Sequence, residues 1–273
     1  MGADDLTAVR NAGATEFSRL TPTVWGPAGA ALAFQLRLRP GESVLDVCCG
    51  AGAAALPAAA AVGPTGLVHA VDRADDLLEL GRLAASDRAL HNIDFVRADA
   101  AAWEPPSSVP RGRYDVLSCS HGVHLLPHPT AAVARLVRLL RPVAKVGVTV
   151  WRRGALDQVG SAFADALARL APGSRPPDPP TASTRLDTPD ALRSWLTAYG
   201  AGSVEVTELS NLLPTTPELA WDLVLGTALR APLLALAADT VAAVRVEFLA
   251  LLTERDVEVV DAGTLVATAV VVH

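Results

Sequence analysis

The residues best suited to chemistry lie within 44–52, where an apolar run that contains Asp46 leads into a turn with Gly50 and Gly52. Glycine lets a backbone approach a ligand closely, and a helix that follows such a turn offers free backbone N–H groups at its start. A second apolar segment ends at Asp72, whose carboxylate is well placed to accept hydrogen bonds from ribose hydroxyls. These features together predict a site for a cofactor that carries adenosine.

The elements that must position these residues alternate regularly between strands and helices. Such alternation predicts a parallel sheet covered on both faces, and the largely apolar run at 146–151 suits a strand buried on both sides. After residue 151 the pattern loosens, and a Pro-rich loop is expected at 172–184. The expected strands are 43–48, 67–71, 92–97, 114–119, 144–151, 202–208 and 264–272, and the expected helices are 28–38, 51–62, 74–86, 130–140, 155–171, one opened by Thr188-Pro189-Asp190, 216–227 and 239–254.

The composition bounds the class of protein. Of 273 residues, 51% are hydrophobic and 19% are charged, which is enough for a sizeable core. The net charge of −6 argues against non-specific binding of nucleic acid, which depends on basic patches. No run of about 18 strongly apolar residues predicts a membrane span, and residues 1–20 do not resemble a signal peptide. No signature of a particular oligomeric state stands out.

The three cysteines show no disulfide framework and no zinc-ligand spacing, which is simplest in a reducing cytoplasm. His121, His124 and His128 are close in sequence, but no carboxylate or cysteine accompanies them at ligand spacing. We therefore expect a cytoplasmic protein that binds a small molecule and no metal.

Several blocks in the chain resemble the motifs of the class I S-adenosylmethionine-dependent methyltransferases, most of all the ubiquinone/menaquinone-biosynthesis-like small-molecule group. The resemblance is good over residues 15–151 and looser beyond. It is carried by Val44 to Gly52, Val71-Asp72-Arg73, Phe95 to Ala100, Tyr114 to Leu117, Leu126-Pro127 and Arg138-Leu139-Leu140-Arg141-Pro142. It implies an α/β fold with a Rossmann-like, doubly wound sheet of about seven strands, mostly parallel with an antiparallel last strand, and helical cap insertions.

The resemblance also implies the cofactor, S-adenosyl-L-methionine, and its product S-adenosyl-L-homocysteine. The matching acid at Asp46 lies near the methionine end in this family, Asp72 binds the ribose, and Arg73 flanks the adenine. Asp99 holds the adenine amino group, with the backbone of Ala100 beside it. The full expected cofactor set is Asp46, Cys48, Gly50, Gly52, Asp72, Arg73, Asp99, Ala100 and Ser120.

Each of these residues also has a purely structural interpretation. Asp46 could bond the amides of the glycine loop, since a buried carboxylate needs donors. Asp72 could cap the helix that follows it, and Asp99 could cap its own loop. Arg73 could be a solvated surface side chain. The sequence leaves both interpretations open for each residue.

The methyl acceptor is expected beside residues 120–128, after the fourth strand. His121 or His124 could take a proton from a hydroxyl group as the methyl arrives, or could simply pack against the cofactor. Trp25, with Phe17 before it, lies in a segment that often folds over the cofactor in this family, where an aromatic ring can shield a sulfonium. Core packing is the alternative for both aromatic residues. No catalytic triad is needed, because methyl transfer depends on orientation and on exclusion of water.

Two positions depart from the family pattern. Cys48 stands where glycine is usual, so the backbone there must accept a Cβ atom. Pro142-Val143-Ala144 replaces the usual Pro-Gly-Gly turn, and Val or Ala would strain a turn that needs a positive φ. We therefore expect a different local geometry before the fifth strand.

The expected organisation is a single methyltransferase domain, 1–273. It divides into an N-terminal helical lid (1–40), a cofactor-binding core (41–151), helical cap insertions on the substrate side (152–200 and 211–258) and the last two strands (201–210 and 262–272).

The expected function is methylation of an oxygen, nitrogen or carbon atom of a small, largely apolar molecule, as in secondary or quinone metabolism. One alternative is a non-methylating protein that binds the same cofactor, because a fold does not determine function. The other is an NAD-dependent oxidoreductase, because residues 50–55 fit a variant of the dinucleotide fingerprint.

Overall fold

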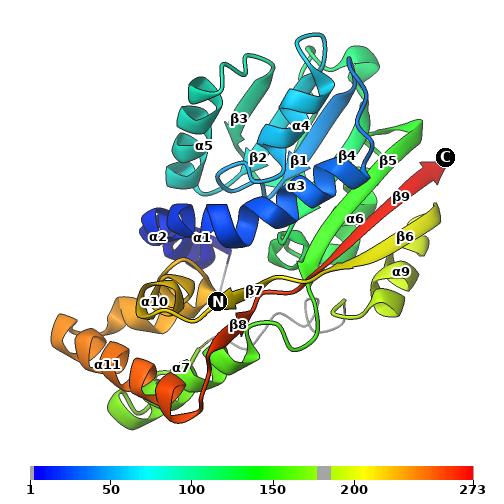
Figure 1. Cartoon of the computed structure of the whole chain (residues 1–273). Coiled ribbons are helices and arrows are strands. Elements are labelled where there is room, and N and C mark those ends of the chain that lie inside the picture. The colour runs from blue at the N-terminus through cyan, green and yellow to red at the C-terminus, as the bar shows by residue number, and fades with distance from the viewer. Residues whose placement is uncertain (1–2, 177–185, 273) are drawn as a thin grey trace. The chain divides into compact units, whose positions relative to one another are not determined.

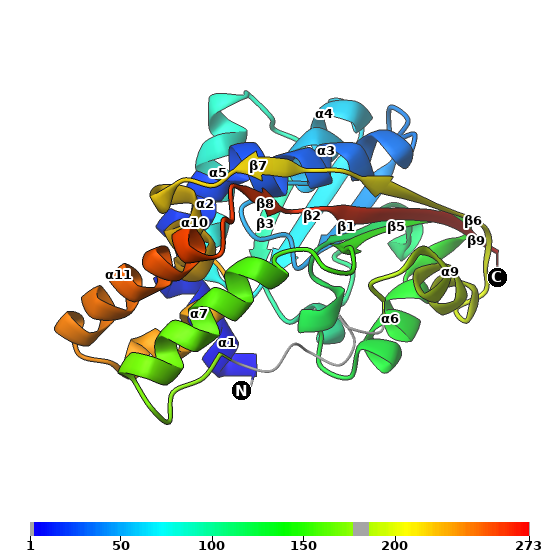
Figure 2. The ribbon, with the colours of Figure 1, turned by 60° about the horizontal axis from the view of Figure 1, so that its bottom comes forward.

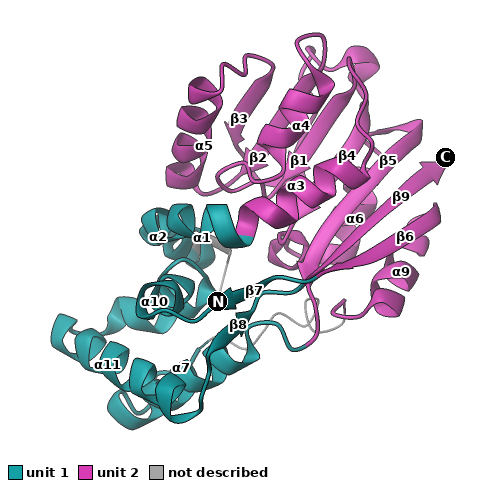
Figure 3. Ribbon diagram, in the orientation of Figure 1, with its two compact units in different colours: residues 1–24, 154–179, 210–263 teal, residues 25–153, 180–209, 264–273 magenta. Residues whose placement is uncertain are grey.

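The computed structural model describes residues 3–176 and 186–272, and the chain forms two compact units (Figure 3). Unit 1 comprises residues 1–24, 154–179 and 210–263, and unit 2 comprises residues 25–153, 180–209 and 264–273. The segment predicted as a lid, 1–40, is divided between the two units after Val24. The domain boundaries drawn from the sequence remain predictions.

Unit 2 is built on one sheet of seven strands, in the order β3-β2-β1-β4-β5-β9-β6 (Figure 1). The first five strands in this order are parallel, whereas β9 is antiparallel to both β5 and β6. This confirms the predicted mostly parallel sheet with an antiparallel last strand. The strands are β1 (Ser43–Val47), β2 (Leu67–Asp72), β3 (Ile93–Arg97), β4 (Tyr114–Ser120), β5 (Leu140–Trp151), β6 (Ala201–Leu209) and β9 (Thr264–Val272).

The chain runs outward from β1 to β3 and then returns to place β4 on the other side of β1. The carboxyl ends of β1 and β4 therefore flank a topological switch point, the place where open α/β sheets bind ligands. Asp46 pairs with Ser118 across these two strands. The glycine loop leaves β1 at this edge, and the loop with both candidate histidines leaves β4 beside it.

Helices cover both faces of the sheet within unit 2 (Figure 2). On one face, the apolar sides of α3 (Gly26–Gln35), α4 (Ala55–Val62) and α5 (Asp75–Asp87) share a buried cluster with β1 and β2. On the other face, α6 (Pro129–Val137) and α9 (Pro189–Thr197) bury Leu136 and Leu192 against β4, β5 and β9. The runs of Val, Leu and Ala in the strands thus meet apolar side chains on both sides, as a parallel sheet requires.

Unit 1 is mainly helical and has a short antiparallel pair of strands, β7 with β8. Phe163, Trp221 and Phe248 pack edge-on or tilted against one another in its core. No helix in the described part of the chain is long and apolar enough to cross a membrane. The elements of unit 1 are α1 (Ala3–Ala12), α2 (Ala14–Leu20), most of a π-helical turn (Thr21–Trp25), α7 (Asp157–Leu170), β7 (Leu212–Pro214), α10 (Pro217–Leu225), a 3-10 segment (Ala228–Ala235), α11 (Ala238–Glu254) and β8 (Val259–Asp261).

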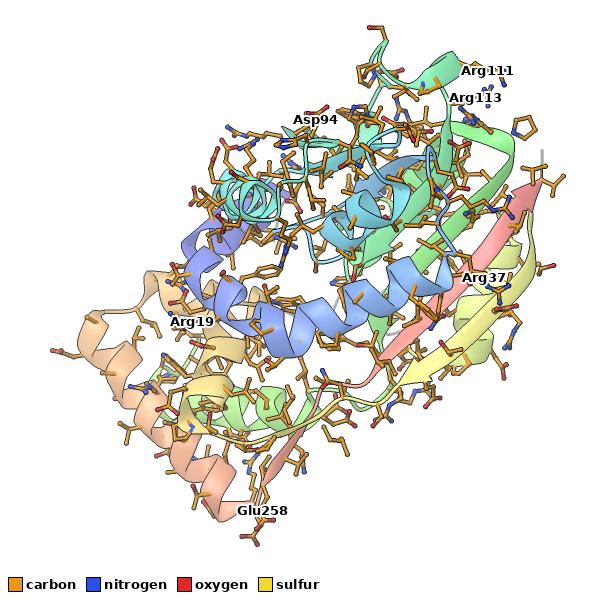
Figure 4. The ribbon with its side chains drawn as sticks, turned by 45° about the horizontal axis from the view of Figure 1, so that its top comes forward. Arg19, Arg37, Asp94, Arg111, Arg113 and Glu258 are labelled. Atoms are coloured by element: carbon orange, nitrogen blue, oxygen red, sulfur yellow. The ribbon has the colours of Figure 1, made fainter. Side chains whose placement is uncertain are left out.

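The stretch before β5 differs from the sequence prediction. The helix predicted to reach residue 140 ends at Val137, and β5 begins at Leu140, so residues 142–144 lie inside the strand. None of these residues has a positive φ. The side chain of Arg113 (Figure 4) supports this start of β5, because its guanidinium donates to the carbonyl oxygens of Arg138 (3.1 Å) and Leu140 (2.8 Å). Because none of residues 142–144 has a positive φ, Val143 and Ala144 are unstrained in the strand.

The glycine loop shortens one of the predicted helices. The helix predicted over 51–62 begins only at Ala55, because residues 51–54 form the turns of the glycine loop. Most of the predicted Pro-rich loop, residues 177–184, lies outside the described residues.

Candidate cofactor and acceptor site

The loop after β1 has the backbone shape of a ligand cradle. Gly50 and Gly52 have φ values of 54° and 85°, in the left-handed region that favours glycine. Cys48 also has a positive φ, 53°, so this departure from the family pattern keeps the backbone conformation and tolerates the Cβ atom. The N–H of Cys49 donates to the carbonyl of Val71 (3.2 Å), which ties the loop to the end of β2.

Helix α3 packs directly on the far side of this loop. A Cβ atom built on Gly29 would lie 2.2 Å from the carbonyl oxygen of Ala53 and 2.7 Å from the nitrogen of Ala54. Only glycine therefore allows the helix backbone to approach the loop this closely. On its other side, a Cβ atom on Gly52 would meet the buried ring of Phe95 at 2.9 Å. The loop is held between these two contacts.

Asp72 lies at the end of β2, and the residue is only 7% exposed. Its Oδ2 accepts a hydrogen bond from the backbone N–H of Gly50 (2.9 Å). Its Oδ1 accepts from the backbone N–H groups of Arg73 (2.7 Å) and Ala74 (2.9 Å). The carboxylate therefore organises both the glycine loop and the turn before α5. Asp72 thus has a structural role, and its binding of the ribose remains a prediction.

Asp46 is buried in the middle of the sheet, beside Ser118 of β4. Its Oδ1 accepts a hydrogen bond from the Ser118 hydroxyl, while its Oδ2 has no hydrogen-bond partner among the described residues. Burial raises the pKa of Asp46 to about 7, against the effect of the Ser118 hydrogen bond, and the negative charge of Asp72 adds to the rise. The structure does not show the alternative in which Asp46 bonds the amides of the glycine loop.

The predicted adenine end lies at the carboxyl ends of β2 and β3. The Oδ1 of Asp99 accepts from the N–H of Ala101 (2.9 Å) and caps a 3-10 turn, Ala100–Ala102. The N–H of Ala98 donates to the Asp72 carbonyl (3.0 Å), so this loop follows directly from the acid at the end of β2. Asp99 and Arg73 are both partly exposed, and Ala100 is buried.

On the predicted acceptor side, His121 is 8% exposed and has an unusual backbone conformation, with a φ of 50°. Its N–H donates to both the carbonyl and the hydroxyl of Thr149 (3.0 Å each), and the same hydroxyl lies 2.9 Å from that of Ser120. The imidazole lies against Trp151, with ring centroids 4.1 Å apart, and meets Trp25 edge-on at 5.8 Å. These contacts hold the ring in one orientation.

The environment of His121 disfavours its charged form. Burial and, to a smaller extent, the nearby His124 lower the pKa of His121 to about 3. The Nε2 atom lies 3.2 Å from the Thr264 hydroxyl, and Nδ1 has no hydrogen-bond partner in the described chain. His121 is therefore neutral at physiological pH and a weak base. His124 is less buried and lies in a 3-10 turn, Val123–Leu125.

The glycine loop and the loop after β4, residues 121–128, meet at Gly122. A Cβ atom there would lie 2.4 Å from the Cβ of Cys48 and 3.0 Å from the sulfur of Cys119. A hydrogen bond from the Cys119 thiol to Cys48 raises the pKa of Cys119, and burial adds to the rise. Cys48 therefore places its side chain against the loop after β4, while its backbone shapes the glycine turn.

The structure thus brings together, within unit 2, every candidate site residue except Phe17, which belongs to unit 1 and lies under the guanidinium of Arg10 at 5.8 Å. Sequence reasoning missed Gly29, Thr149 and Thr264, which hold the loops in place. Only Gly29 had a signal, a glycine inside a predicted helix. No group of three His, Cys, Asp or Glu side chains that could hold a metal ion occurs within 3–176 and 186–272.

Comparison with known proteins places this geometry in a family. Residues 44–143 match the methyltransferase domain family. Nocamycin O-methyltransferase of Saccharothrix syringae is 34% identical over 217 residues, which cover 76% of this chain and 72% of that protein. Aklanonic acid methyltransferase of a Streptomyces species is 33% identical over 151 residues, 55% of this chain and 67% of that protein.

Among solved structures, an S-adenosylmethionine-dependent methyltransferase from Aquifex aeolicus shares the fold, with a TM-score of 0.51 and 16% identity over 93% of each chain. The sequence match to the nocamycin enzyme spans most of both chains, and the matched domain contains the glycine loop, Asp72 and Asp99. The chain therefore belongs to the class I S-adenosylmethionine-dependent methyltransferases, its cofactor is S-adenosylmethionine, and it methylates a small molecule.

Proposed function

We propose that this methyltransferase acts on an oxygen atom of a small, largely apolar molecule. The observation that carries this proposal is the similarity to nocamycin O-methyltransferase, which extends over 217 residues and so well beyond the matched domain at 44–143. We propose that the elements outside the cofactor-binding core hold the acceptor. Similarity to the nocamycin enzyme in these elements favours a related acceptor chemistry.

The residues of the site fit the cofactor, which supplies an electrophilic methyl group when bound. The positive φ values of Gly50 and Gly52 open the backbone of the loop to a ligand, and Asp46 offers a buried carboxyl oxygen with no partner in the described chain. We propose that Asp46 meets the amino-acid end of the cofactor, Asp72 the ribose, and Asp99 with Ala100 the adenine. Cys48, Arg73 and Ser120 complete the proposed cofactor surface.

On the acceptor side, we propose different roles for the two histidines. His121 is a poor proton acceptor because its pKa is about 3, and its fixed position between Trp25 and Trp151 suits it to form a wall of the acceptor site. His124 is then the candidate for taking a proton from an acceptor hydroxyl. Phe17 and Trp25 are proposed to contact the acceptor.

Incubation with S-adenosylmethionine that carries a ¹³C-labelled methyl group tests the proposal. The acceptors are a panel of phenols, enolic β-dicarbonyl compounds, aromatic carboxylic acids and aromatic amines. We expect the label in an O-methyl ether or ester, identified by its ¹³C chemical shift, together with S-adenosylhomocysteine. Labelling of nitrogen or carbon alone would contradict the oxygen assignment. Tight cofactor binding without labelling of any acceptor would favour a non-methylating member of the fold.

A further inference from the structure

Asp46 is a buried acid, and no cationic side chain in the described chain neutralises its charge. Its Oδ1 accepts a hydrogen bond from Ser118, and its Oδ2 accepts none. No arginine or lysine pairs with it in the parts of the chain that the structure describes. A buried carboxylate with one donor and no cation is costly, and the usual resolution is that the group keeps its proton.

The other ionisable groups near Asp46 strengthen this preference. Asp72, at the end of the neighbouring strand β2, carries a negative charge that disfavours a second one on Asp46. Cys119 of β4 and Cys48 of the glycine loop lie on the other side, and the charge of Asp46 would in turn raise the pKa of the Cys119 thiol. None of these groups supplies positive charge. Consistent with this, the pKa of Asp46 is raised to about 7.

We propose that Asp46 holds a proton on Oδ2 in the cofactor-free protein and releases it when S-adenosylmethionine binds. The O–H bond breaks, its electron pair stays on the carboxylate, and the proton passes to the buffer. The new negative charge is then compensated by the ammonium group of the cofactor's amino-acid end. This inference rests on the proposed placement of Asp46 at that end of the cofactor.

Proton release makes cofactor affinity depend on pH in a defined direction. Below the pKa of Asp46, a proton must be removed before the ion pair can form, so binding weakens as the pH falls. For a pKa of about 7, the dissociation constant should rise about 25-fold from pH 7.5 to pH 5.5. The measurements should stay below about pH 7.5, because α-amino groups lose their own proton near pH 8.

Isothermal titration calorimetry of the full chain tests this proposal directly. S-adenosylmethionine and S-adenosylhomocysteine are titrated in PIPES and in imidazole buffers, whose ionisation enthalpies differ, so that the heat reports the protons exchanged. We expect release of close to one proton per cofactor at about pH 6 and much less at about pH 7.5. 5′-Deoxy-5′-methylthioadenosine, which lacks the amino-acid part, should bind without releasing a proton.

Two variants identify the group that is titrated. Asp46→Asn keeps the shape of the protonated acid, and we expect its binding heat to be independent of the buffer and its cofactor affinity to be independent of pH in this range. Ser118→Ala removes the hydrogen bond that lowers the pKa of Asp46, so the pH at which affinity is lost should move upward. This second variant keeps the test decisive if Asp46→Asn does not fold.

The outcomes separate this proposal from the assigned function. Cofactor binding with no proton release in the wild-type protein, or the same release in Asp46→Asn, would overturn the role of Asp46 and leave the methyltransferase assignment intact. Failure of S-adenosylmethionine to bind at any pH would instead contradict the function itself.

Discussion

The carboxylate of Asp72 accepts a hydrogen bond from the backbone N–H of Gly50 at 2.9 Å, which joins the end of β2 to the centre of the glycine loop. The same carboxylate accepts from two further backbone amides at the start of the next helical turn. The sequence leaves open whether this acid binds the ligand or caps the helix that follows it. Here it also holds the shape of the cradle.

Replacement of Asp72 by asparagine should therefore affect stability as well as binding. The amide cannot accept at both positions, so at least one backbone N–H loses its partner, at an expected cost of about 1–3 kcal/mol in the free energy of unfolding. Cofactor affinity should fall at least tenfold, which calorimetry and urea unfolding can measure on the same sample. Asp75→Asn is a matched control in the first turn of α5, where a solvated pair with Arg97 contributes less than about 1 kcal/mol. Equal effects of the two substitutions would contradict the role of Asp72.

Gly29→Ala should distort the cofactor loop from outside the site. The added methyl group would lie 2.2 Å from the Ala53 carbonyl oxygen, which is backbone and cannot rotate away. We expect destabilisation by about 1–3 kcal/mol and weaker cofactor binding, because α3 or the loop must move. Gly160→Ala in α7 is the control, since nothing lies within 4 Å of the new atom. That substitution should stabilise the protein by about 0.5–1 kcal/mol. Unchanged cofactor affinity in Gly29→Ala would show that the contact is not transmitted to the loop.

Tyr114→Phe should destabilise the protein, because the Tyr114 hydroxyl belongs to a buried polar cluster in the sheet. The Tyr114 hydroxyl lies 2.7 Å from Nδ1 of His69 and accepts from the indole N–H of Trp103 (3.1 Å), while Nε2 of His69 faces Asp94 (Figure 4) at 3.7 Å. Its removal leaves two buried nitrogens without that partner, at an expected cost of about 1–3 kcal/mol in unfolding free energy.

Tyr199→Phe is the matched control for Tyr114→Phe. The Tyr199 hydroxyl is buried and has no hydrogen-bond partner within the described residues, so its loss should leave stability unchanged or slightly improved. Urea unfolding of the two variants measures the difference. Equal free energies of unfolding for the two variants would mean that the hydrogen bonds of the Tyr114 hydroxyl contribute nothing to stability.

Substitution of the two histidines should separate packing from proton transfer, once labelled methyl transfer has identified an acceptor. His124→Ala should lower kcat about 100-fold or more if His124 removes the acceptor's proton, with cofactor affinity unchanged. His121→Phe keeps an aromatic ring against Trp151 and should lower kcat by less than about tenfold. A large loss of kcat in His121→Phe with normal activity in His124→Ala would reverse the assignment.

Much of the fold was readable from local patterns. The alternation of apolar runs and turn residues predicted the strands of the sheet to within a few residues, with the exception of the start of β5. That exception has a physical cause. Pro142 and Val143 could follow a turn or continue a strand, and the pairing of Val143 with Val272, far along the chain, favours the strand. A pairing between such distant residues has no local signal.

The sequence by itself determined which residues line the cofactor loop, because glycine, small residues and an acid at a strand end have direct consequences for backbone shape and charge. Only the tertiary structure decided what surrounds them. The hydrogen bond from Ser118 to Asp46, the close approach of Gly29 to Ala53 and the burial of His121 between Trp25 and Trp151 all join residues that are distant in the chain. Hydrogen bonds, steric contacts and desolvation depend on distances in space. The pKa shifts of Asp46 and His121 therefore follow from their burial in the tertiary structure and not from the local sequence.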